Sequence, residues 1–150
     1  MKKYKFRLQT VLDIKEKLVE QKLRELSEIV SLLNKEVEIE KELIQKRNTL
    51  QASIIEMNSM DSPLNLFEVQ NSRGYWGSLG VSIAKQRERI KNVEFFMQAK
   101  QNEVNEAIKE KKVLENLKEK EQEAFYREYL RLESKELDDI AIQRYDRKQA

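Results

Sequence analysis

The chain has 150 residues, of which 37% are charged, and its mean hydropathy is −0.78. Its apolar content is too low for a thick globular core, while three glycines and one proline are too few for a low-complexity disordered segment. Lysine and arginine number 29 against 27 acidic residues, and the two signs are interleaved along the chain. This balance disfavours a dedicated nucleic-acid binder and favours a long helix with a charged surface.

The first element predicted is a helix from about residue 5 to about residue 58. Its apolar residues recur in steps of four and three, which is the seam of a heptad repeat. The seam consists of Val19, Leu23, Leu26, Val30, Leu33 and Val37. It then shifts by one position and continues through Ile39, Leu43, Leu50 and Met57.

A short turn is expected at about 59–62, where small polar residues cluster. Ser62 followed by Pro63, the only proline, is typical of a helix cap with proline at the first helical position. A second helix is therefore predicted from about 63 to about 146. Its seam consists of Leu79, Ile83, Gln86, Ile90, Val93, Met97, Lys100 and Val104.

Within the second helix, residues 72–82 read SRGYWGSLGVS and contain all three glycines and the only tryptophan. Counting back from Leu79 places Trp76 on the seam, where it packs against the first helix, and Tyr75 beside the seam. Glycine inside a helix costs about 1 kcal/mol relative to alanine, so this segment is expected to be locally softened.

Two helices joined by a short turn pack antiparallel, so the predicted fold is an all-α coiled-coil hairpin forming one domain over 1–150. If residue 58 lies opposite residue 63, Phe6 faces about Glu115. The second helix is then the longer one and overhangs at the C-terminus by about 30 residues, or roughly 45 Å. The overhang is rich in apolar side chains, so we expect another protein to bury it. A different start of the first helix, or coverage by a second copy, remains open.

Several functional classes lack the residues they need. The absence of cysteine and histidine excludes disulfides, thiolate nucleophiles, the usual zinc sites and the commonest general base. The glycines match no phosphate-binding motif, Asp138 and Asp139 point about 100° apart on a helix, and two thin helices enclose no pocket. We expect no catalytic residue, no metal and no cofactor, and hence no enzyme.

No signal peptide and no long apolar run are visible, so a soluble cytoplasmic protein is expected, without direct membrane insertion. Basic residues at the two ends fall at different heights of the predicted hairpin and form no single patch. Nucleic acid is therefore not an expected partner.

The ends of the chain resemble the FliJ family of flagellar export proteins. The resemblance is carried by FRLQTVLDIKEKLVEQ at 6–21 and LKEKEQEAFYREYLRLESKELDDIAIQRYDR at 117–147. It implies a stalk similar to the gamma subunit of rotary ATPases, which inserts into the hexameric export ATPase (FliI-like) ring, promotes its activity and links it to the export gate (FlhA-like). Such a stalk is non-enzymatic and lies at the cytoplasmic membrane only through the export apparatus.

The resemblance also implies two sets of contact residues. The export-gate contacts would be Tyr75, Leu79, Ser82 and Gln86, although Leu79 and Gln86 alternatively belong only to the seam. The ATPase-ring contacts would be Phe6, Leu8, Phe125, Tyr126, Tyr129, Leu132, Leu137, Ile140 and Tyr145. Binding of export chaperones stays open.

Three other functions remain possible on sequence alone. The stalk of a non-flagellar type III secretion system would have the same fold and role. A coiled-coil scaffold that dimerises through its overhang would sediment as a dimer, and an RNA-binding helical hairpin would bind RNA tightly at physiological salt.

Overall fold

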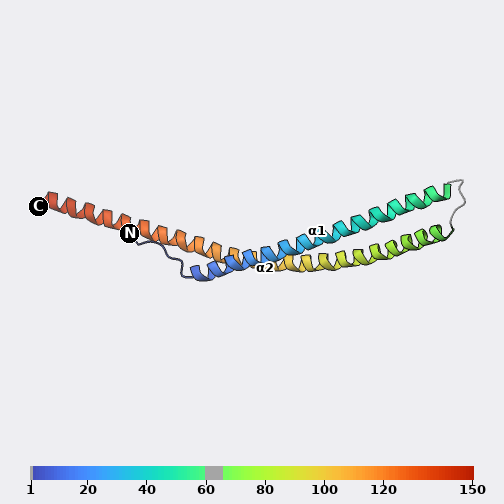
Figure 1. The fold of residues 1–150 in the computed structure, drawn as a ribbon. Helices are drawn as coiled ribbons and strands as arrows, with labels where there is room; N and C mark the ends of the chain where they lie inside the picture. Colours follow the sequence, from blue (N-terminus) through green and yellow to red (C-terminus); the bar gives the residue numbers. More distant parts are fainter. Residues whose placement is uncertain (1, 60–65) are drawn as a thin grey trace. The chain divides into compact units, whose positions relative to one another are not determined.

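The computed structural model describes residues 2–59 and 66–150, which form two helices and no strand within those ranges. Helix α1 spans Gln9–Ser59 and helix α2 spans Leu66–Gln149 (Figure 1). The prediction of an all-α hairpin with a longer second helix is confirmed. The predicted cap at Ser62 and Pro63 and most of the predicted turn lie outside the described residues.

The start of the first helix was predicted wrongly, because α1 begins at Gln9 and residues 2–6 have no regular structure. The Gln9 backbone N–H donates to the Phe6 carbonyl at 3.2 Å, which closes the turn that leads into the helix. Lys2, Lys3 and Lys5 would place positive charge at a helix N-terminus, where the helix dipole disfavours it.

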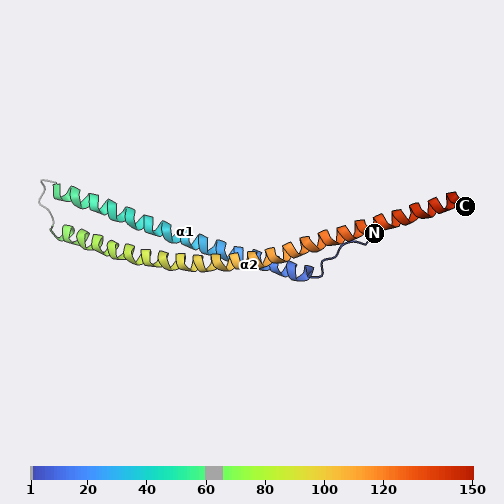
Figure 2. The same cartoon turned by 180° about the vertical axis from the view of Figure 1, so that it is seen from behind.

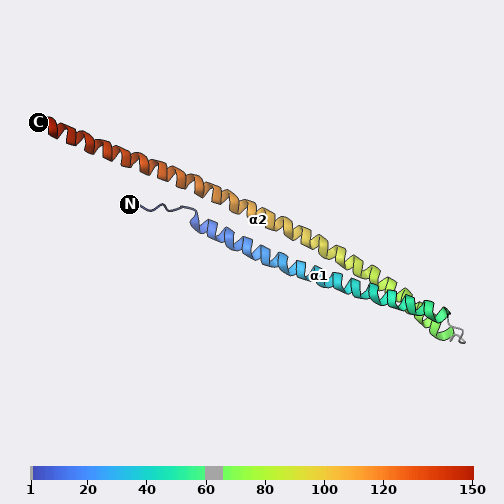
Figure 3. The ribbon, with the colours of Figure 1, turned by 90° about the horizontal axis from the view of Figure 1, so that it is seen from above.

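The described residues gather in two units. Among the described residues, the terminal unit comprises 2–21 with 105–150, and the central unit comprises 22–59 with 66–104. Within each unit the α1 segment runs alongside the α2 segment, as Figure 1, its reverse view in Figure 2 and the view from above in Figure 3 all show. Each unit is therefore a pair of helical segments with its own core.

Ion pairs indicate the register of each unit, and in the central unit they also show that the two helices are antiparallel. In the terminal unit Lys15 Nζ lies 2.7 Å from Glu110 Oε2. In the central unit Lys22 Nζ lies 3.0 Å from Glu103 Oε2, and Lys100 Nζ lies 2.8 Å from Glu25 Oε2. The two residue numbers of each pair add up to 125, whereas pairing residue 58 with residue 63 predicts 121. Each residue of α1 therefore faces a residue of α2 about one helical turn later than predicted. The prediction took its register from the turn alone, whereas the packing of opposite charges selects it.

The face of α2 that packs on α1 follows the predicted heptad. Leu79, Ile83, Gln86, Ile90 and Val104 are buried. Val93, Met97 and Lys100 are half-buried. Val69, Trp76 and Ala107 continue the same steps in both directions, so the seam of α2 is longer than predicted.

The predicted seam of α1 is partly wrong. Leu23 and Val30 are 46% and 38% exposed, and the neighbouring Lys22 and Ile29 take their places. No shift of position occurs after Val37. The observed seam is one unbroken heptad, in which the buried and half-buried residues are Leu12, Lys15, Val19, Lys22, Leu26, Ile29, Leu33, Glu36, Glu40, Leu43, Arg47, Leu50, Ile54 and Met57.

Polar residues of this seam have partners on α2, although Arg47 Nε is buried without a hydrogen-bond partner among the described residues and its guanidinium contacts the Trp76 ring. Gln86 is 4% exposed, and its Nε2 donates to the Glu36 backbone carbonyl at 2.9 Å and to the Glu36 carboxylate. Arg87 Nε lies 3.2 Å from Glu40 Oε1. Because burial of a polar group is costly only when it lacks a partner, these hydrogen-bonded residues can occupy seam positions.

Candidate functional site

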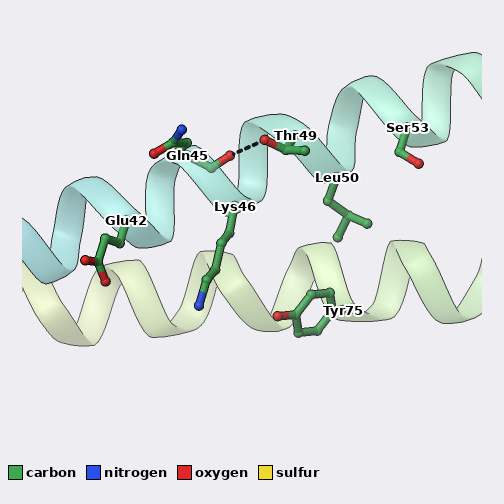
Figure 4. Close-up of a pocket in the computed structure, with 7 residues that line it drawn as sticks. All are labelled: Glu42, Gln45, Lys46, Thr49, Leu50, Ser53 and Tyr75. Atoms are coloured by element: carbon green, nitrogen blue, oxygen red, sulfur yellow. Dashed lines mark hydrogen bonds between the residues drawn. The ribbon is translucent and has the colours of Figure 1, made fainter.

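Tyr75 lies on one side of the seam of the central unit, in a groove of about 660 Å³. Figure 4 shows Lys46 and Leu50 reaching from α1 towards α2, with the Tyr75 ring below Leu50. Thr49 Oγ1 donates to the Gln45 carbonyl at 2.9 Å and so bonds within α1. Tyr75 is 54% exposed, which leaves much of its ring accessible to a partner.

The other three predicted export-gate contacts are less accessible. Leu79 and Gln86 are buried in the seam, as the alternative interpretation held, and Ser82 is half-buried. The four residues therefore do not form one exposed face. Of this set, Tyr75 presents the large surface that a partner can contact directly.

The glycine-containing segment 72–82 is helical throughout, and one of its glycines has a packing role. The Arg47 guanidinium lies 3.9 Å from the centroid of the Trp76 ring, a cation–π contact. A Cβ on Gly80 would meet Arg47 Nη2 at 3.0 Å, whereas one on Gly74 or Gly77 would meet nothing within 4 Å. Gly80 therefore makes room for the arginine, and Trp76 packs at the seam as predicted.

In the terminal unit, the segment before α1 covers part of α2. The Tyr4 hydroxyl lies 3.4 Å from Glu121 Oε2, and its ring centroid lies 5.5 Å from that of Phe125. Partial burial and the Glu121 carboxylate raise the pKa of Tyr4 above its usual value. Because extended chain rises about 3.3 Å per residue against about 1.5 Å in a helix, a few residues reach far along α2. The expectation that α2 has no partner beyond about Glu115 is wrong for this reason.

The predicted ATPase-ring contacts fall into two groups. Phe6 is buried, and Leu8, Phe125 and Tyr129 are half-buried within the terminal unit. The remaining members are 48% to 63% exposed, namely Tyr126, Leu132, Leu137, Ile140 and Tyr145. Only this second group offers extensive surface to another molecule.

Every residue from 131 to 150 is exposed, and we call this segment the uncovered stretch. Between residues 126 and 145 the helix exposes seven large apolar side chains. At about 100° per residue, five of them fall within an arc of roughly 140°, whereas Leu132 and Ile142 lie outside it. This C-terminal stripe consists of Tyr126, Leu130, Leu137, Ile140 and Tyr145, all exposed. Leu130 was not among the predicted contacts, although its four-residue spacing from Tyr126 could have identified it.

The C-terminal stripe is not a continuation of the hairpin seam. Stepping three and four residues on from the half-buried Phe125 and Tyr129 leads to Leu132, Glu136, Asp139, Gln143 and Asp146. That face is polar apart from Leu132. The stripe is therefore rotated away from the seam by roughly one residue, or about 100°.

Two kinds of site are absent from the part of the chain that the structure describes. None of its His, Cys, Asp and Glu residues form a group of three or more that could hold a metal ion. No helix within residues 2–59 and 66–150 has the length and apolar character needed to cross a membrane. What the described residues do present is exposed apolar helix surface.

A comparison with protein families assigns the chain to one of them. The family model described as "Flagellar FliJ protein" matches residues 4–150. The chain belongs to the FliJ family. In general terms it is thus a stalk component of a flagellar or type III protein export apparatus, and its family is structural rather than enzymatic. Searches of curated proteins and of solved structures find no significant match.

Proposed function

We propose that this FliJ-family protein is a non-enzymatic stalk whose uncovered stretch inserts into the ring of the flagellar export ATPase (FliI-like). The observation that carries the proposal is the C-terminal stripe, which lies entirely on exposed helix. Because its direction differs from that of the seam, another protein is a better explanation of these apolar residues than pairing with α1. A ring lumen would bury a single helix over its whole length.

The stalk would promote ATPase activity by binding. A helix with one apolar side contacts the subunits of a ring unequally and so stabilises some subunit conformations over others. The bonds that hold the hairpin together would not need to change. A soluble cytoplasmic protein that reaches the membrane through the export apparatus follows from the same proposal.

Two isoleucines provide a matched test. Ile140 lies on the C-terminal stripe and is 48% exposed, whereas Ile142 lies about 200° further round the helix and is 59% exposed. We expect Ile140→Glu to abolish most stimulation of the cognate ATPase and Ile142→Glu to leave most of it. Steady-state ATP hydrolysis at increasing stalk concentration measures both.

Deletion of residues 131–150 is the complementary test. It leaves the Tyr4 contacts to Lys118, Glu121 and Phe125 in place, so the hairpin should remain helical. Undiminished stimulation by the truncated protein would refute insertion. Equal loss from both isoleucine substitutions would refute the one-sided contact.

We further propose that Tyr75 and its groove contact the export gate (FlhA-like). Leu79 and Gln86 would support that contact by holding α2 against α1. Tyr75→Ala should reduce binding of the purified cytoplasmic part of the gate protein while ATPase stimulation persists. Tyr126→Ala is the control, because Tyr126 is 48% exposed against 54% for Tyr75 and lies in the terminal unit. Loss of gate binding in both variants would contradict a contact at Tyr75.

The C-terminal stripe also supports a second candidate, a scaffold that dimerises through it. Sedimentation of the free protein separates the two. A monomer at micromolar concentration supports insertion into the ring, whereas a tight dimer that Ile140→Glu dissociates supports the scaffold. Whether the export system is flagellar or a related type III system, and whether chaperones bind, are matters for pull-downs with those components.

A further inference from the structure

The central unit has an apolar stripe beside its seam that takes no part in the proposed ATPase-ring or export-gate contacts. Leu23, Val30, Val37 and Ile44 follow one another at intervals of seven residues on α1. Leu23 and Val30 are exposed, and Val37 and Ile44 are half-buried. We call these four residues the flanking stripe. A heptad spacing in addition to the seam itself is typical of helices that pack against two neighbours.

Contacts between α1 and α2 distinguish the flanking-stripe side of the seam from the Tyr75 side. Glu40 with Arg87, and Arg47 with Trp76 and Gly80, lie on the flanking-stripe side, because Ile44, the last stripe residue, follows Glu40 by four residues and precedes Arg47 by three. The opposite side contains Lys22, Glu25, Lys100 and Glu103, with Tyr75 further along. On that opposite side, the residues at seven-residue intervals are Glu25, Leu32, Ile39 and Lys46. Charged residues therefore precede and follow its two apolar residues. The flanking-stripe side has no such interruption between Leu23 and Ile44.

The α2 rim of this side permits close approach. Gly80 lies across from the end of the stripe, and a side chain on Gly77 would meet no atom within 4 Å. An apolar hollow of about 490 Å³, lined by Ile54, Ile55, Arg73, Trp76 and Gly77 among others, extends the same side. The stripe repeats every seven residues of α1 over about 30 Å, and a helix packed alongside shares that heptad period, so an α-helix is the occupant that matches it.

The charges on the rim indicate which charged side chains the docking helix would carry. Heptad positions beside the stripe hold four basic residues and two acidic residues, namely Glu20, Lys41, Arg73, Arg87, Lys91 and Glu94. Arg87 is 60% exposed at its side chain although it contacts Glu40. A helix with acidic residues flanking its apolar face would complement this rim.

We propose that the flanking stripe and its basic rim form a docking groove for a third α-helix, supplied by a partner protein and bearing an apolar heptad face with acidic flanks. The groove is distinct from the C-terminal stripe and from the Tyr75 groove. Its occupant would convert the two-helix central unit into a three-helix bundle. The inference does not rest on the ATPase or export-gate proposals.

A designed peptide is the probe. It has about four heptads, leucine at both core positions and glutamate at both flanking positions, so that like charges keep it monomeric and largely unfolded alone. We expect the full-length protein to bind it in the micromolar range by fluorescence anisotropy, with a gain of peptide helicity by circular dichroism. The same peptide with lysine in place of glutamate should bind about tenfold more weakly or less.

Matched variants locate the binding site. Leu23→Gln with Val30→Gln should weaken peptide binding about tenfold or more, since the central apolar contacts of an interface dominate its energy. Leu32→Gln with Ile39→Gln should change it less than twofold, although Leu32 and Leu23 are each 46% exposed. Arg73→Glu with Lys91→Glu changes only the rim and should also weaken binding of the glutamate peptide.

Four results would overturn the proposal. They are absence of binding at about 100 μM peptide, equal weakening by the two apolar pairs, equal affinity for the lysine peptide, or a dimer of the free chain that Leu23→Gln with Val30→Gln dissociates. The last would assign the groove to a second copy. Thermal unfolding of each variant checks that the hairpin itself is intact.

Discussion

Two parts of α2 share a helical backbone and recurring apolar residues, yet they differ in burial. Between residues 69 and 104, every third or fourth residue is buried or half-buried against α1. Between 131 and 150, no residue is buried, although Leu137, Ile140 and Tyr145 are as apolar as the seam. The apolar pattern therefore identifies surfaces that need a partner, and only the structure distinguishes an internal partner from an external one.

The largest expected contrast comes from truncating one leucine in each part. Leu79→Ala removes a side chain that is 5% exposed and should destabilise the protein by about 2–4 kcal/mol. Leu137→Ala, at 63% exposure, should change stability by less than about 0.5 kcal/mol and instead reduce ATPase stimulation. Urea unfolding followed by circular dichroism measures the first effect. A large loss of stability from Leu137→Ala would mean that the uncovered stretch has an internal partner.

A smaller effect is expected from the buried polar layer of the central unit. Gln86→Ala would leave the Glu36 carboxylate without its Gln86 donor and should cost about 1–3 kcal/mol. Gln98→Ala is the control, because the Gln98 amide donates to Asn102 Oδ1 at 3.4 Å on an exposed surface. Equal urea midpoints for the two variants would show that Gln86 contributes nothing at the seam.

Glycine substitutions should divide by position. Gly74→Ala and Gly77→Ala introduce a Cβ into open space and should each stabilise the helix by about 0.5–1 kcal/mol. Gly80→Ala places its Cβ 3.0 Å from Arg47 Nη2, so Arg47 must shift against Trp76 and the gain should be smaller or absent. Thermal unfolding of the three single variants gives the comparison, and three equal gains would contradict a role for Gly80. Hydrogen exchange as slow at 72–82 as at 90–104 would likewise contradict local softening.

The smallest effect concerns pH. Hydrogen bonds from Lys100 and Lys22 lower the pKa of Glu103 below its ordinary 4.5. Its contribution to stability is therefore fully present above about pH 4.5 and is lost as the pH falls through the lower folded-state value. Hydrogen bonds with Glu25 and Glu103 raise the pKa of Lys100, so that contribution is lost only as the pH rises above its ordinary 10.5. Stability curves from pH 3 to pH 6 should be flatter for Glu103→Gln, and identical curves would refute the coupling.

The helical hairpin, the seam of α2 and the position of Trp76 could be predicted because each depends on a local three- and four-residue period. The seam of α1 could not be predicted from the positions of apolar residues alone. Lys22, Glu36, Glu40 and Arg47 occupy seam positions there, and they are stabilised by partners about 30 to 80 residues away on α2. A count along one helix cannot detect such partners.

The candidate sites show the same limit. The exposure of Tyr75 agrees with its predicted position beside the seam, and an apolar surface late in α2 could be inferred from composition. The coverage of Phe125 by Tyr4 was missed because the segment before α1 was taken as helical. The direction of the C-terminal stripe relative to the seam needed the observed burial of Phe125 and Tyr129 as a reference.

The central claim is that the C-terminal stripe is uncovered in the free protein and becomes covered in the ATPase ring. Hydrogen exchange followed by mass spectrometry, with and without the cognate ATPase and a non-hydrolysable nucleotide, tests it most directly. We predict rapid exchange at 131–149 in the free protein, strong protection of that segment in the complex, and little change at 79–104. Unchanged exchange at 131–149 in a complex whose formation is verified by sedimentation would contradict the account.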